Sequence, residues 1–111
     1  MKKLLLSFIL TALVLAAQTT HTATLTWNDT TNPSGTTYNI YRASGLCSGN
    51  PSYTKIATSI TAKTYVDSTV TPGNYCYYAT ATFGGVESGP SNTALAPIPS
   101  FAPTNLTVTV Q

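Results

Sequence analysis

The chain has 111 residues, which is enough for one domain, and only 7% of them are charged. The formal net charge of +2 comes from Lys2 and Lys3, because the remaining three basic residues balance the three acidic ones. This near-neutral composition gives no support for binding to nucleic acid or to anionic lipid.

The first segment has the pattern of a secretory signal peptide. A short basic head precedes an apolar run from Leu4 to Ala17, which ends in small and aliphatic residues suited to a signal-peptidase site. As a helix this run would span only ~21 Å, less than the ~30 Å hydrocarbon core of a bilayer. We therefore expect residues 1–17 to be cleaved. The mature protein should then be secreted, to the extracellular space or the cell surface, and should not insert into a membrane.

Two cysteines, Cys47 and Cys76, remain in the mature part. In an exported chain an even pair is more often a disulfide than two free thiols. Neither cysteine lies in a C-x-x-C arrangement, which argues against a metal or redox site. On the chain-entropy model, the bridge would stabilise the fold by ~3–4 kcal/mol.

Short runs of alternating apolar and polar residues follow one another along the mature chain, and no long segment has helical periodicity. Turn-forming Gly, Pro, Asn and Asp residues separate the runs. This spacing is typical of an all-β sandwich. We expect six strands, at residues 22–27, 38–42, 53–58, 63–70, 75–83 and 91–96.

Several motifs between residues 21 and 97 resemble those of the fibronectin type III domain family. In chain order they are "TATLTW" ending at Trp27, "YNIYR" (38–42), "VTPGNY" (70–75), "YCYYATA" (75–81) and the loop "GGVESGPSN" (84–92). The resemblance implies an Ig-like, fibronectin type III β-sandwich of about seven antiparallel strands, in which residues 18–97 form strands B to G and strand A is displaced to the C-terminus. Trp27, Tyr38 and Ile40 should then lie in its core.

The segment from Val70 to Tyr75 has the form of a tyrosine corner, in which the ring packs inward and the hydroxyl bonds to the backbone upstream. Side chains of the following strand should alternate between its two faces. We expect the core face to carry Tyr75, Tyr77, Ala79 and Ala81, and the outer face to carry Cys76, Tyr78 and Thr80. In the family's layout this strand starts near the end of the strand at 38–42. A Cys47–Cys76 bridge would then cross the outer face.

No group of residues has the spacing of a catalytic, cofactor or metal site. The only histidine, His21, is expected to be an exposed residue near the mature N-terminus. In the family's layout the loops that carry Asp29 and Glu87 share one pole, so a carboxylate pair is conceivable there. Neither a histidine nor a second acid accompanies it, and we expect no enzyme activity and no cofactor.

Two outward tyrosines, Tyr41 and Tyr78, should lie side by side on adjacent strands. We expect a cross-strand aromatic pair that stabilises the sheet, while stacking on a carbohydrate or a protein partner stays open. Sequons at Asn28 and Asn105 permit glycosylation in a suitable host.

The last segment, residues 98–111, is a Pro-rich spacer followed by a strand-like tail. Its "APTNLTVTV" (102–110) resembles strand A of the family, with Leu106, Val108 and Val110 on one face. Too few residues precede "TATLTW" to supply that strand after signal cleavage. The tail could therefore fold back, insert beside the first strand of another copy, or begin a second module. The last two hypotheses rank nearly level, ahead of the first.

The resemblance implies a non-catalytic module that mediates extracellular contacts with a protein partner, a cell surface or a matrix. Two alternatives remain open. The chain could be a subunit that self-assembles by donating its C-terminal strand, or an accessory module of a larger extracellular, carbohydrate-active enzyme.

Overall fold

The computed structural model describes residues 19–111, so the predicted signal peptide lies outside the described residues. The prediction of an all-β fold is confirmed, and a 3₁₀ turn at Cys47–Gly49 is the one helical element among the residues that the structure describes. The strands are β1 (Ala23–Thr26), β2 (Thr37–Ser44), β3 (Thr54–Ile60), β4 (Thr64–Asp67), β5 (Gly73–Phe83), β6 (Val86–Glu87) and β7 (Ala94–Ile98).

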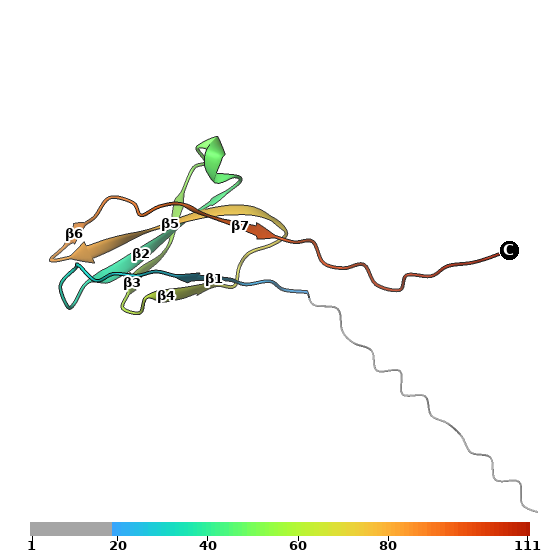
Figure 1. Cartoon of the computed structure of the whole chain (residues 1–111), viewed down its shortest axis with the longest axis horizontal. Coiled ribbons are helices and arrows are strands. Elements are labelled where there is room, and N and C mark those ends of the chain that lie inside the picture. The colour runs from blue at the N-terminus through green and yellow to red at the C-terminus, as the bar shows by residue number, and fades with distance from the viewer. Residues whose placement is uncertain (1–18) are drawn as a thin grey trace, which may run out of the picture.

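The strands form two sheets in which every pair is antiparallel (Figure 1). In the smaller sheet β1 pairs with β4 alone. The larger sheet has the order β3–β2–β5, and the free edge of β5 pairs with β6 near one end and with β7 near the other. In Figure 1 the β1–β4 sheet lies below the larger one.

The Gly84–Gly85 pair makes the tight turn from β5 to β6. Both residues have positive φ, 58° and 78°, as both central residues of a type I′ hairpin turn require. The strand expected at residues 91–96 instead spans Ala94–Ile98. The physical reason lies in Ser88 and Ser91, whose hydroxyls accept the β5 amides at 2.9 Å where a regular strand would use its carbonyls.

The core lies between the two sheets around Ile40, Val70 and Tyr77, which are fully buried. Side chains from both sheets pack against this cluster, and Trp27 meets Tyr38 edge to face at 5.3 Å between ring centroids. Trp27 itself is only half-buried. The core is therefore incompletely covered on the β1 side.

The outer face of β5 is less exposed than the alternation alone suggests. Cys76 and Thr80 lie opposite to the core-facing Tyr77, yet they are only 0% and 6% exposed. The disulfide loop covers the first, and a polar cluster around Asn39 and Glu87 covers the second. The groups that cover Cys76 and Thr80 come from other segments of the chain, and the alternation of side chains along one strand does not predict such contacts.

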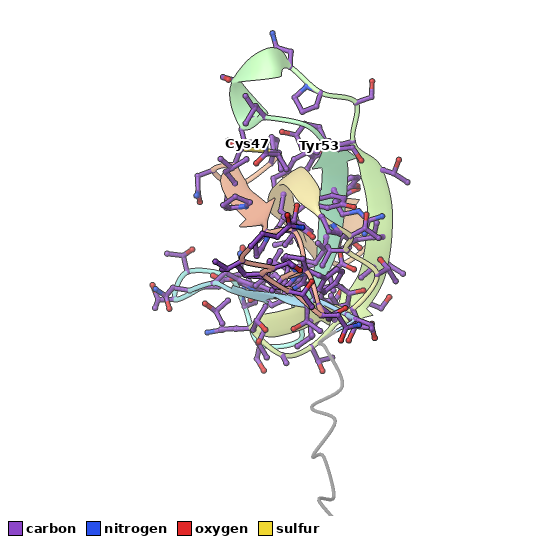
Figure 2. All side chains as sticks on the ribbon, turned by 90° about the vertical axis from the view of Figure 1, so that its right-hand side faces the viewer. Cys47 and Tyr53 are labelled. Carbon is purple, nitrogen blue, oxygen red and sulfur yellow. A yellow bond between two sulfur atoms is a disulfide. The ribbon has the colours of Figure 1, made fainter. Side chains whose placement is uncertain are left out.

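The predicted Cys47–Cys76 disulfide is present, with 5.2 Å between the Cα atoms. It ties the loop that carries Tyr53 to the start of β5, and the Tyr53 hydroxyl lies 3.1 Å from the Cys76 sulfur. Figure 2 shows Cys47 and Tyr53 at the end of the molecule away from the β1–β4 sheet. Such a bond is compatible with an extracellular location. Within residues 19–111 no helix is long and apolar enough to cross a membrane.

Candidate functional site

A groove of about 810 Å³ runs along β1. One wall is β1 with the loop that follows it, and the other is formed by β5 and the segment 88–96 that leads into β7. The groove therefore opens where the two sheets are not joined by any described strand. It is the best candidate in the described part of the chain for a site that binds something.

One side of β1 carries unpaired backbone groups. The Trp27 amide donates to the Lys63 carbonyl at 3.1 Å, so the odd-numbered residues of this strand direct their backbone groups toward β4. Thr24 and Thr26 therefore direct their N–H and C=O groups away from β4, where no described strand lies. Such an edge can pair with a further strand.

Small side chains leave the groove open on the opposite wall. Ala79 and Ala81 of β5 and Ala94 and Ala96 at β7 all line it. An alanine fills much less space than the Val, Leu and Ile residues that dominate sandwich cores, and protein interiors are normally packed without large voids. Side chains from elsewhere could therefore enter without displacing any part of the fold.

The β1 wall of the groove is apolar and only partly covered. Ala23, Leu25 and Trp27 face the core cluster, yet all three stay half-buried. The indole Nε1 of Trp27 is buried and has no acceptor among the described residues. The partial exposure of these three side chains shows that the β1 wall is not fully covered by the described chain.

The C-terminal tail makes little contact with the rest of the described chain. Leu106, Val108 and Val110 are 88%, 81% and 87% exposed, and no described strand includes them. In Figure 1 the tail runs away from β7 in an extended path. The chain thus presents an apolar stripe on the tail and a partly covered apolar wall at β1 that do not meet within one molecule.

The tail is held near its start by a ring stack. Phe101 lies parallel to His21, with 4.3 Å between ring centroids. The expectation of an exposed His21 is wrong, because the Phe101 ring covers it and leaves it half-buried. This stack places the start of the tail beside the N-terminal end of β1.

The structure separates Asp29 from Glu87. The Asp29 carboxylate accepts the Tyr38 hydroxyl at 2.7 Å, whereas the Glu87 carboxylate accepts the Asn39 amide at 3.2 Å. Consecutive residues of a strand point to opposite faces, so the two acids lie on opposite faces of β2. Hydrogen bonds lower the pKa of both carboxyls. The largest contribution comes from the Tyr38 hydroxyl for Asp29 and from the Thr80 hydroxyl for Glu87.

No cluster of His, Cys, Asp and Glu that could hold a metal ion occurs in residues 19–111. The sites of both sequons, Asn28 and Asn105, are exposed.

Tyr41 and Tyr78 pair across β2 and β5, and their rings stack with 4.6 Å between centroids. Tyr53 meets the Tyr78 ring edge to face at 4.7 Å, and the Lys55 ammonium lies 5.5 Å from the centre of the Tyr41 ring. The ring faces therefore contact one another and a lysine. This arrangement favours a role in stabilising the sheet.

Sequence reasoning missed a buried polar cluster that joins the sheets. Asp67 of β4, only 2% exposed, accepts bonds of 2.8 Å from Arg42 of β2 and from Tyr77 of β5. Burial alone would raise the pKa of Asp67, but bonds from Thr69, Tyr77 and Arg42 outweigh it and lower the pKa to about 2. Burial and the neighbouring carboxylate raise the pKa of Tyr77.

Because too few residues precede residues 22–27 to supply a strand beside them, the sequence predicted an open edge with an uncovered stretch of core there, but it did not predict the alanine-lined wall on the other side of the groove. The signal available was the alanine spacing at residues 79, 81, 94 and 96. That spacing gains meaning only when two strands from separate parts of the chain are known to be neighbours.

Comparisons with known proteins add no family to this description. No family model matches the chain, and no curated protein matches it.

Proposed function

We propose that this chain is a non-catalytic, secreted, fibronectin type III-like module that makes protein contacts by accepting a β-strand at the open edge of β1. The groove of about 810 Å³ along β1 carries the proposal. It combines unpaired backbone groups at Thr24 and Thr26 with space beside the apolar side chains of β1 and the alanines of β5 and β7; β-strand addition uses main-chain hydrogen bonds for affinity and side-chain pockets for specificity.

The strand order supports the type III assignment. In sandwiches of this class one sheet contains strands A, B and E, and the other contains C, F and G. The order here corresponds to that layout without strand A, if β1 and β4 are strands B and E and if β2, β5 and β7 are strands C, F and G. The Tyr75 hydroxyl also lies 3.2 Å from the Thr71 amide, as expected of a tyrosine corner.

The placement of the acids supports a contact function rather than chemistry. Asp29 and Glu87 were the one carboxylate pair that the sequence offered, and they lie on opposite faces of β2 with separate hydrogen-bond partners. The Cys47–Cys76 disulfide is compatible with the proposed extracellular setting.

Trp27, the only tryptophan of the chain, lines the groove and allows a direct test. A peptide of residues 103–111 is added to the full chain carrying Leu106→Asp, which disables the chain's own tail. We expect Trp27 emission to shift to shorter wavelength as the peptide covers the indole. Backbone amides of Thr24 and Thr26 should become protected from hydrogen exchange.

Two controls accompany the titration. Thr24→Pro, added to the same chain, removes one donor from the open edge, and proline is tolerated on an edge strand. A peptide with Asp in place of Val108 should bind much more weakly, because it would bury a charge. Unchanged emission at millimolar peptide, or equal binding by the proline variant, would refute the strand-accepting function.

A further inference from the structure

The groove and the tail have complementary properties. No described strand occupies the groove, and alanines line its wall opposite β1. The tail carries bulkier apolar side chains at residues 106, 108 and 110, which have no described strand partner. We propose, on the basis of the strand-accepting function above, that the strand is supplied by residues 106–110 of a second copy of this chain, antiparallel to β1. Repetition of this contact would link copies head to tail.

The faces of the two segments determine their register. In an antiparallel pair, residues directly opposite each other have side chains on the same face. The tail must turn its apolar face to the core, as β1 does with Ala23, Leu25 and Trp27. The register that meets this condition over the whole of β1 pairs Leu106 with Trp27, Thr107 with Thr26, Val108 with Leu25, Thr109 with Thr24, and Val110 with Ala23.

This register also satisfies the open edge. Thr24 and Thr26 would each exchange backbone hydrogen bonds with a threonine of the incoming strand, while the threonine side chains stay on the solvent side. The Leu and Val side chains would fill the space that Ala79, Ala81 and Ala96 leave on the other wall. The tail therefore matches the groove in shape, in the placement of polar and apolar side chains, and in backbone hydrogen bonding.

A chain's own tail is too short to reach its own groove in this orientation. Phe101 is stacked on His21, at the start of β1. To pair as described, Leu106 would have to lie beside Trp27, ~20 Å further along the strand. Five residues reach at most ~18 Å fully extended, with nothing left for the reversal of direction. An antiparallel occupant in this register must then come from another molecule.

The direction of the tail suits a second molecule. In Figure 1, β1 begins at the right-hand end, where β7 also ends and the tail departs to the right. A second copy placed beyond that end in the same orientation would receive the tail at the C-terminal end of its own β1. The tail would then run antiparallel to that β1.

The segment that follows β7 is suited to act as a spacer, because Pro99 and Pro103 lack N–H groups and favour extended backbone. Donor and acceptor surfaces differ, so the contact is heterologous and does not close a two-fold dimer.

The first experiment measures the mass of the mature full chain against concentration. We expect a ladder of oligomers that lengthens as concentration rises. Val108→Asp should shift assembly to at least about tenfold higher concentration, because one buried charge costs more than the 1.4 kcal/mol that a tenfold change represents. Thr109→Asp is the matched control, since it adds the same charge one position away on the solvent face.

The second experiment tests the register by cross-linking. Oxidation of a mixture of a Thr24→Cys chain and a Thr109→Cys chain should give a disulfide-linked heterodimer. A mixture of Thr24→Cys with Val108→Cys should not, because those side chains point to opposite faces.

The outcomes separate this proposal from the one on which it rests. If the full chain stays monomeric at millimolar concentration while the 103–111 peptide still shifts Trp27 emission, the second-copy proposal fails and the strand-accepting function stands. A monomer whose tail is protected from exchange would indicate fold-back and would equally overturn it. Oligomers that Val108→Asp and Thr109→Asp weaken to the same degree would assign assembly to another surface.

Discussion

Arg42 and Asp67 form an ion pair of 2.8 Å that joins the larger sheet to the smaller one. The Tyr77 hydroxyl donates to the same carboxylate oxygen at 2.8 Å, so side chains from β2, β4 and β5 meet at one point. These bonds connect the sheets beside the groove, because Asp67 pairs with Ala23 of β1 and because Ala23 and Tyr77 both line the groove. They join the two sheets, which share no strand pairing among the described residues.

The bond from Tyr77 to Asp67 predicts that Tyr77→Phe destabilises the fold more than Tyr75→Phe does. Tyr77→Phe removes a bond to a buried carboxylate and should lower the free energy of unfolding by about 2 kcal/mol. Tyr75→Phe removes a neutral bond to Thr71 on an exposed turn and should cost about 1 kcal/mol. Urea unfolding of both variants measures the difference. An equal or reversed order would contradict the role given to the Asp67 cluster.

The depressed pKa of Asp67 predicts a loss of stability in acid. Hydrogen bonds from Thr69, Tyr77 and Arg42 outweigh the effect of burial and lower the pKa of the Asp67 carboxyl from its ordinary 3.8 to about 2, so the folded state binds the proton less readily. The contribution of Asp67, ~2 kcal/mol, is therefore complete above pH 4 and is lost as the pH falls from about 4 to about 2. The lowered pKa values of Asp29 and Glu87 act in the same direction.

Denaturant midpoints measured between pH 7 and pH 2 test this dependence. Asp67→Asn should be less stable than the parent at pH 7 and should lose less on acidification. If the two pH profiles run parallel, Asp67 is not a source of the acid sensitivity.

Removal of the disulfide should cost ~3–4 kcal/mol on the chain-entropy model. The double variant Cys47→Ala/Cys76→Ala avoids leaving a buried thiol beside Tyr53. Its stability should match that of the reduced parent within about 1 kcal/mol, and reductant should not change it further. A variant as stable as the oxidised parent would show that the bridge contributes little to this fold.

The hydrogen bonds of the buried Asn39 side chain predict a loss in the free energy of unfolding when that side chain is removed. Its side chain is 4% exposed, donates to Thr80 and Glu87, and accepts the Thr58 hydroxyl at 2.7 Å. Asn39→Ala should lower the free energy of unfolding by about 2–3 kcal/mol, because it leaves several polar groups with fewer partners. Asn92→Ala, at an exposed position, is the matched control and should stay within about 0.5 kcal/mol of the parent. Thermal unfolding of both variants provides the measurement.

The sequence by itself determined six of the seven described strands, their approximate limits and the Gly84–Gly85 turn, but not the short β6. These features depend on neighbours in the chain: period-two alternation, β-branched residues and glycines that allow positive φ. The pairing of Cys47 with Cys76 was also within reach, because the described chain offers no other cysteine.

Only the tertiary structure decided which polar residues are buried and which side chains line the groove. Nothing local marks Asp67 as a buried acid, since its partners Arg42 and Tyr77 come from other strands. The groove depends likewise on small side chains of β5 and β7 facing an unpaired β1. The burial of Asp67 and the open groove both depend on contacts between segments far apart in the sequence, so they arise only once the sheets have assembled.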